Sequence, residues 1–133
     1  MTAAKSAAAA EGERKPTAID ENHLGRMTLG DRRLEREVLE IFVRQTTIIL
    51  SRIVGADPAL AAAAAHTLKG SARGIGAWRV ARAAELLEQT ATGDGSEGDI
   101  SVAIDELKAA SLEASAAIAG RLTGLLAGLA RDR

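Results

Sequence analysis

Cysteine is absent from the 133-residue chain, so disulfide bridges, thiolate metal sites and a cysteine nucleophile are excluded. Aromatic residues are almost missing too, at 2% of the chain, with Phe42 and Trp78 as the only two. This shortage, beside abundant alanine, leucine, arginine and glutamate, favours helices over strands. No apolar run approaches the roughly 20 residues that span a bilayer. We therefore expect one soluble, helical protein with no membrane partner.

A strong charge of either sign is also lacking, because 17 basic and 18 acidic residues leave a net charge of -1 and are interleaved. The basic patch typical of nucleic-acid binding is not seen. The N-terminal residues lack the leucine-rich centre of a secretory signal. We expect a cytoplasmic protein that binds no nucleic acid. We also expect a monomer, since the leucines near residues 118–129 are better explained as bundle core than as a coiled-coil contact.

The chain divides into a flexible N-terminal tail, residues 1–17, and one domain, residues 18–131. Within the domain, apolar residues recur at helical spacing between breaks that contain glycine, proline or aspartate. The predicted helices cover residues 21–28, 31 to about 55, 58 to about 73, 77 to about 92, and from about 99 onward. Because the connections are short, neighbouring helices should run antiparallel. The predicted fold is all-α, an antiparallel four-helix bundle with a short extra N-terminal helix.

Each long helix should turn one apolar stripe toward the core. The predicted stripes are, in chain order, Leu34, Val38, Leu39, Ile41, Phe42, Thr46, Ile49, Leu50 and Ile53; Leu60, Ala64 and Leu68; Val80, Ala84, Leu87 and Ala91; and Ile100, Ile104, Leu107, Ser111, Ala114, Ile118, Leu122, Leu125 and Leu129.

Of the two histidines, His66 has the more informative surroundings. Its neighbours one turn away are Ala62, Ala63, Lys69 and Gly70, and the core residue Leu68 points to the opposite side of the helix. His66 should therefore face outward among small side chains. A glycine inside a helix costs about 1 kcal/mol relative to alanine, so Gly70 indicates a need for space beside the imidazole. Ordinary solvation of a surface histidine is the alternative. For His23 we expect only surface or partly buried filler without a chemical role.

The predicted turn between the third and fourth helices relates His66 to an acid. His66 and Glu88 are each eleven positions from Ala77, so an antiparallel hairpin centred there brings them to the same height. The Glu88 carboxylate can then accept a hydrogen bond from Nδ1–H and leave the lone pair of Nε2 facing outward. The alternative is a solvated glutamate.

The string from His66 to Ala77, HTLKGSARGIGA, resembles the signature of histidine phosphotransfer (HPt) domains, in which His-x-x-Lys-Gly precedes small residues and a glycine. Residues 30–42 look like the second helix of the family, and residues 83–88 look like the helix that faces the histidine. The resemblance covers residues 18–92. Beyond the loop at Gly93 only helical character agrees.

The resemblance implies that His66 is the phosphorylated residue and that Glu88 is hydrogen-bonded to it. By the same resemblance, Lys69 neutralises charge on the phosphoryl oxygens and Gly70 admits the active site of the partner. Arg73 is a weaker candidate for a phosphate or partner contact. The protein would be a phosphocarrier without an ATP site, relaying phosphoryl groups between receiver domains of hybrid histidine kinases and of response regulators.

The docking surface for a receiver should consist of the small residues around the histidine, including Ala59, Ala62 and Ala63, with a contribution from the short first helix. The chain has no cluster of carboxylates suited to Mg²⁺, so we expect no metal or cofactor in this protein. The Mg²⁺ that acts in the transfer should belong to the partner receiver domain, as the resemblance also implies.

Two alternatives remain, a fragment of a hybrid kinase and a helical interaction module, whereas an autonomous kinase is disfavoured. An autonomous kinase would need a nucleotide-binding domain, but fewer than 70 residues follow His66, and Gly70 to Gly76 lacks the Gly-Lys-Ser/Thr ending of a P-loop. A fragment of a hybrid kinase stays open, although Met1 and the tail favour a free-standing protein. The other alternative is a helical interaction module that docks on a receiver without accepting phosphate.

Overall fold

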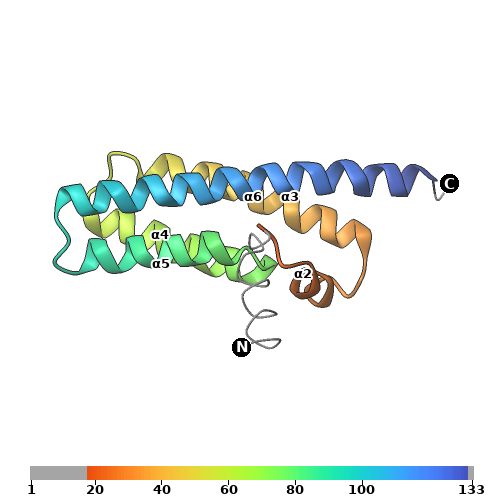
Figure 1. The fold of residues 1–133 in the computed structure, drawn as a ribbon, viewed down its shortest axis with the longest axis horizontal. Helices are drawn as coiled ribbons and strands as arrows, with labels where there is room; N and C mark the ends of the chain where they lie inside the picture. The colour runs from red at the N-terminus through yellow and green to blue at the C-terminus, as the bar shows by residue number, and fades with distance from the viewer. Residues whose placement is uncertain (1–17, 132–133) are drawn as a thin grey trace, which may run out of the picture.

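The computed structural model describes residues 18–131, and every regular element in that range is a helix (Figure 1). Each long helix contacts its neighbours along the chain, and the last helix also packs on the first long one, which closes the bundle. The predicted all-α bundle is confirmed. The predicted tail, residues 1–17, lies outside the described residues. The helices are α2 (Glu21–Met27), α3 (Arg32–Ile53), α4 (Pro58–Ile75), α5 (Trp78–Thr92) and α6 (Glu97–Arg131).

Aspartates begin three of the helices. Asp20, Asp31 and Asp57 precede α2, α3 and α4, and each accepts hydrogen bonds of 2.9–3.1 Å from backbone N–H groups of the first turn. A helix leaves its first N–H groups without intrahelical partners, and a short acidic side chain satisfies them. Pro58 follows its cap at the first helical position, where a missing N–H costs nothing. The starts of these helices are thus local properties of the sequence.

Two helix ends differ from the prediction. α4 continues through Gly74 and ends at Ile75, because Gly76 takes the left-handed conformation, with φ of 81°, that caps it. A Cβ at position 76 would lie 3.0 Å from Cβ of Asp20, so the site also requires glycine for space. α6 begins at Glu97 instead of near residue 99. Ser96 and Asp99 exchange backbone-to-side-chain hydrogen bonds of 3.0 and 3.1 Å, which start the helix earlier.

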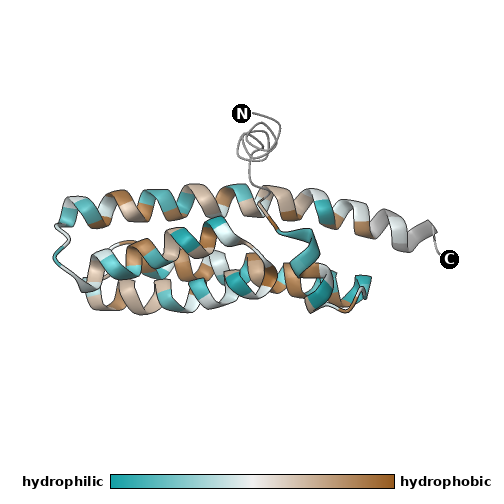
Figure 2. Ribbon diagram, turned by 60° about the horizontal axis from the view of Figure 1, so that its bottom comes forward, coloured by the Kyte–Doolittle hydropathy of each residue, from teal (hydrophilic) through white to brown (hydrophobic). Residues whose placement is uncertain are grey.

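The core lies between the long helices, whose polar and apolar residues alternate around each axis (Figure 2). The predicted stripe of α5 is confirmed in its first three members, which are buried, whereas the fourth, Ala91, is partly exposed. In α6 the predicted stripe is confirmed from Leu107 to Ile118, whereas the side chain of Leu129 falls outside what the structure describes. The largest apolar side chains that are fully buried are Leu24, Leu39, Ile53, Leu68, Leu87, Leu107, Ile118 and Val80.

Three residues predicted to lie in the core are on the surface. Leu34, Ile41 and Leu60 are 38%, 45% and 62% exposed. The prediction weighted bulky side chains, but α4 packs through a stripe made mostly of alanines. Small side chains fill the narrow space where helices approach closely, and Leu60 falls outside that stripe by about one residue. The buried residues of α4 are Ala61, Ala62, Ala65, Leu68, Ala72 and Ile75.

The short helix α2 is held against the turn between α4 and α5. The backbone N–H of Asp20 donates to the carbonyl of Gly76 at 2.9 Å, and Nε1 of Trp78 donates to the Asp20 carboxylate at 2.9 Å. The Trp78 hydrogen bond and the backbone N–H of His23 lower the pKa of Asp20. His23 contacts the Gly74 carbonyl through Nε2 at 3.2 Å and meets the Trp78 ring edge-on at 4.9 Å. His23 is partly buried, as expected, and these two contacts, which the sequence did not predict, hold α2 against the turn.

A three-helix ion pair joins α2, α3 and α6, and the sequence did not predict it. The guanidinium of Arg121 binds both oxygens of Glu35 at 2.7 and 3.0 Å and one oxygen of Glu21 at 2.6 Å. Glu35 is only 7% exposed, and its carboxylate is the main cause that raises the pKa of Arg121. The burial of Glu35 could have been predicted from the sequence, because Glu35 lies one turn before Leu39 on the apolar face of α3.

Candidate functional site

His66 stands in the middle of α4 with its side chain 66% exposed. The core residue Leu68, two positions later, is fully buried on the other side of the helix. Two residues are about 200° apart on an α-helix, so burial of Leu68 turns the imidazole outward. The predicted exposure of His66 is confirmed.

Glu88 reaches the imidazole from α5. Its Oε2 lies 2.8 Å from Nδ1 of His66, so the hairpin prediction that placed the two side chains at one height is confirmed. An ionised carboxylate can only accept a hydrogen bond, so Nδ1 must carry the proton. In the neutral ring, Nε2 then has a free lone pair on the exposed side of the helix. The contact selects one tautomer and one orientation of the ring.

Lys69 completes the cluster from the same flank of α4. Its Nζ donates to the other oxygen of Glu88, Oε1, at 2.6 Å, and its side chain is 14% exposed. Glu88 thus uses one oxygen for the lysine and one for the histidine. The sequence pointed to Lys69 but not to this contact, although Lys69 lies three positions after His66, on the side of α4 that faces α5.

These contacts favour the negatively charged form of Glu88. The hydrogen bond from Lys69 is the main cause that lowers the pKa of Glu88, and the hydrogen bond from His66 acts in the same direction. Partial burial opposes them by disfavouring the charged form. The net direction is downward, so Glu88 is an anion at neutral pH and an acceptor for Nδ1–H.

Small residues surround the imidazole, but one of the residues predicted for the docking surface, Ala62, is buried. Ala59, Ala63 and Gly70 are exposed, whereas Ala62 is 5% exposed and does not line the open face. Ala62 lies one turn before His66 on the flank that carries Lys69, and α5 covers that flank. A Cβ added at Gly70 would meet nothing within 4 Å. Packing within the described chain therefore does not require a glycine at position 70.

Arg73 is not part of the cluster. It forms an ion pair of 3.6 Å with Glu85 of α5, and both side chains are largely exposed, at 53% and 41%. The structure thus brings Lys69 and Glu88 to His66 and places Arg73 in a separate, solvent-screened pair.

Among residues 18–131, no group of three histidine or acidic side chains is placed to hold a metal ion. Within that range, no helix has the length and apolar content needed to cross a bilayer.

An exposed imidazole with a fixed tautomer and an anion behind it is a nucleophile whose reacted, positively charged form is stabilised. A family model described as Hpt domain matches residues 37–130. The chain belongs to the Hpt domain family. The match contains all of α4 and α5, and hence the complete cluster around His66 in this Hpt protein. It begins within α3 and extends through most of α6, where the sequence alone had shown only helical character. No curated protein and no solved structure matches the chain.

Proposed function

We propose that this Hpt protein carries a phosphoryl group on His66 between the receiver domain of a hybrid histidine kinase and that of a response regulator. Membership in the family indicates histidine phosphotransfer in two-component signalling. The observation that carries the proposal for this chain is the 2.8 Å contact between Nδ1 of His66 and Glu88, on an imidazole that is 66% exposed.

The transfer begins with Nε2. Its lone pair attacks the phosphorus of a phosphoaspartate on the receiver, and the N–P bond forms as the P–O bond to the aspartyl group breaks. The electron pair of that bond stays on the aspartate as carboxylate. Phosphoryl transfer passes through a loose, in-line transition state, so positioning and charge stabilisation contribute most of the catalysis. In the next step a carboxylate oxygen of the aspartate of the second receiver attacks the phosphorus. The P–O bond forms as the N–P bond breaks, and the electron pair of the N–P bond returns to Nε2.

Glu88 acts through Nδ1 of the ring. When Nε2 gives its lone pair to phosphorus, the ring acquires positive charge while Nδ1 keeps its proton. The Glu88 carboxylate, already 2.8 Å away, stabilises that charge without reorganisation. The neutral imidazole already carries a lone pair on Nε2, so the ring needs no strong base to act as a nucleophile.

Lys69 has two parts in the proposal. Its ammonium, 2.6 Å from Oε1, holds the carboxylate so that Oε2 faces the imidazole. It also adds positive charge beside the phosphoryl oxygens, three positions along the helix from His66. The first part follows from the contact in the structure, and the second follows from the family resemblance.

The receiver docks on the exposed face around His66. Ala59, Ala63 and Gly70 leave room for its active site, and Gly70 supports this because nothing within the described chain occupies the space beside it. Arg73, on the border of this face, is proposed as a contact. The Mg²⁺ needed for the phosphoaspartate comes with the receiver. An apolar groove of about 220 Å³ continues the face toward α2 and α3, and it is lined by Met27, Val38, Ile41, Phe42, Gln45, Ser71, Gly74 and Ile75.

The proposal is tested by mixing the protein with a receiver that bears radiolabelled phosphoaspartate. Acid-labile, base-stable label should appear on the wild type and be absent from His66→Gln. Label that persists on His66→Gln would contradict the site. Stable binding of the receiver by the wild type without any label would favour the interaction module instead. Incubation with ATP alone should give no label, since the proposal assigns no kinase activity to the chain.

A further inference from the structure

The largely apolar core between α3 and α6 contains two hydroxyl side chains. Thr46 of α3 and Ser111 of α6 are each only 2% exposed. Neither hydroxyl oxygen has a hydrogen-bond partner among residues 18–131. A hydroxyl that leaves water without gaining a partner costs free energy, so buried polar groups are nearly always paired. Both side chains therefore need a partner that the described residues do not supply.

Thr28 shows how the chain satisfies a buried hydroxyl within a single helix. It is 0% exposed, and its hydroxyl donates to the carbonyl of Leu24, four residues earlier, at 2.9 Å. This bond to the preceding turn is open to any serine or threonine inside a helix. Thr46 and Ser111 also lie inside helices, yet neither hydroxyl forms it. Both hydroxyls are thus left for a partner other than the backbone of their own helix.

The order of residues along α3 and α6 places the two hydroxyls at the same level of the bundle. The two helices run antiparallel and pack on each other (Figure 1), and the 2.7 Å ion pair between Glu35 and Arg121 gives a common reference. Thr46 follows Glu35 by eleven residues, and Ser111 precedes Arg121 by ten. Two buried positions separate each hydroxyl from the ion pair: Leu39 and Phe42 on α3, and Ile118 and Ala114 on α6. The two hydroxyls therefore belong to one layer of the core, with a difference in height of about one residue.

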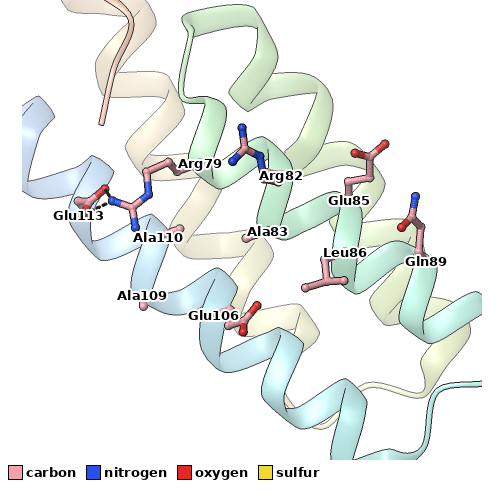
Figure 3. A pocket seen from close by; sticks show the side chains of 10 residues that line it. All are labelled: Arg79, Arg82, Ala83, Glu85, Leu86, Gln89, Glu106, Ala109, Ala110 and Glu113. Atoms are coloured by element: carbon pink, nitrogen blue, oxygen red, sulfur yellow. Dashed lines mark hydrogen bonds and ion pairs between the residues drawn. The ribbon is translucent and has the colours of Figure 1, made fainter. Parts of the chain in front are cut away.

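Ser111 lies on the inner side of α6. Ala109, Ala110 and Glu113 line the surface groove between α5 and α6, where Figure 3 shows them. Ser111 shares its side of the helix with Ala114, which lies three positions later and is 1% exposed. The hydroxyl is therefore part of the bundle core and does not line the surface groove.

We propose that Thr46 and Ser111 together bind one internal water molecule between α3 and α6. Two hydroxyls in one layer, with no direct hydrogen bond between them, form the arrangement that a bridging water completes. Each hydroxyl donates to the water oxygen, and the water donates to helix carbonyls, which keep a second lone pair. These groups supply the roughly three partners that a buried water usually has. The site does not include His66, Lys69 or Glu88, so the inference is independent of the proposed function.

A high-resolution crystal structure of the full chain tests the site directly. One ordered water should lie within hydrogen-bond distance of both Oγ1 of Thr46 and Oγ of Ser111. A direct hydrogen bond between the two hydroxyls would overturn the proposal. The same holds if each hydroxyl bonds a carbonyl of its own helix, as Thr28 does, or if no water lies between them.

Urea unfolding gives a second test, because removal of a hydrated hydroxyl and of an unpaired one should have opposite effects. Thr46→Val and Ser111→Ala should each lower the folding equilibrium constant about three- to tenfold, since each removes a hydrogen bond to the water. The double variant should lower it by clearly less than the product of the two effects, because both changes remove the same bridge. Single variants more stable than the wild type, as expected for unpaired hydroxyls, would overturn the proposal.

Thr28→Val combined with Ser111→Ala is the matched control for this coupling. The hydroxyl of Thr28 bonds within α2, so the two changes should act independently and give the full product of their separate effects. If Thr46→Val and Ser111→Ala are as independent as this control pair, no shared water joins them, and the proposal is wrong.

Discussion

The side chains of His66 and Glu88 meet at 2.8 Å because each stands eleven residues from Ala77, where the α4–α5 hairpin turns. Gly76 caps α4 in the left-handed conformation, and Trp78 begins α5 two residues later. The turn is therefore tight, and small changes in it would move the two side chains along the helices relative to each other. The geometry of the turn sets the geometry of the reacting ring.

Replacing Glu88 by alanine should slow phosphoryl transfer about ten- to hundredfold, because a charge-assisted hydrogen bond to the ring is lost. The bundle should stay folded, since Glu88 lies outside the core. Transfer from a phosphorylated receiver, followed in rapid-mixing experiments, measures the rate. Glu85→Ala removes the same charge one turn away and is the control. Equal slowing by both variants would contradict a specific role for Glu88.

Lys69→Met should raise the pKa of Glu88 toward the ordinary glutamate value, because the hydrogen bond from Lys69 is the main cause that lowers it. Carbon-13 NMR titration of the Glu88 carboxyl group measures this pKa in the wild type and in the variant. A lowered folded pKa stabilises the fold above the unfolded pKa, and this contribution is lost as pH falls through the folded pKa. The variant should thus be less stable than the wild type near neutrality, and this difference should disappear in acid, below the folded pKa. An unchanged pKa in the variant would contradict the assigned cause.

Gly70→Ala and Gly76→Ala should change stability in opposite directions. At position 70 a Cβ meets nothing, so alanine should raise the free energy of unfolding by about 0.5–1 kcal/mol. At position 76, with φ of 81° and Asp20 in the way, it should lower the free energy by about 1–2 kcal/mol. Urea unfolding of the wild type and the two variants measures these free energies. Gly70→Ala should also slow transfer if the space serves the receiver; faster transfer would contradict that use.

Leu87→Ala should destabilise the bundle by about 2–5 kcal/mol, because Leu87 is fully buried and its truncation leaves a cavity. Leu112→Ala, at a side chain that is 72% exposed, should change stability by less than about 0.5 kcal/mol. Thermal or urea unfolding compares them. Leu87→Ala should still accept phosphate where it remains folded, since Leu87 is a core residue and is not part of the polar cluster of His66, Lys69 and Glu88. Similar losses from the two leucines would contradict the assignment of the core.

The hairpin cluster was predictable because its parts are close in sequence and separated by one turn. Counting from Ala77 relates positions on consecutive helices, so the sequence led to Glu88. The same counting cannot reach residues on helices that are not consecutive. Trp78 binds Asp20 across 58 residues, and Arg121 binds Glu35 across 86 residues. Such contacts depend on how α2 and α6 settle on the bundle, which no local pattern specifies.

The errors have a different physical origin. The sequence predicts Leu60 in the core and Ala62 on the docking surface, yet Leu60 is exposed and Ala62 is buried in the structure. In an alanine-rich helix the hydrophobic contrast between faces is small, so a few bulky side chains do not define the buried face. Tertiary packing decides there, and α5 covers the flank of α4 that carries Ala62 and Lys69.

The position of the phosphoryl group on the ring tests the central claim most directly. The chain, labelled with nitrogen-15 in histidine, is phosphorylated by a receiver and observed by long-range proton–nitrogen NMR. The hydrogen bond between Nδ1 and Glu88 predicts phosphorylation of His66 at Nε2, with Nδ1 still protonated. Phosphorylation at Nδ1, or on any residue other than His66, would contradict it.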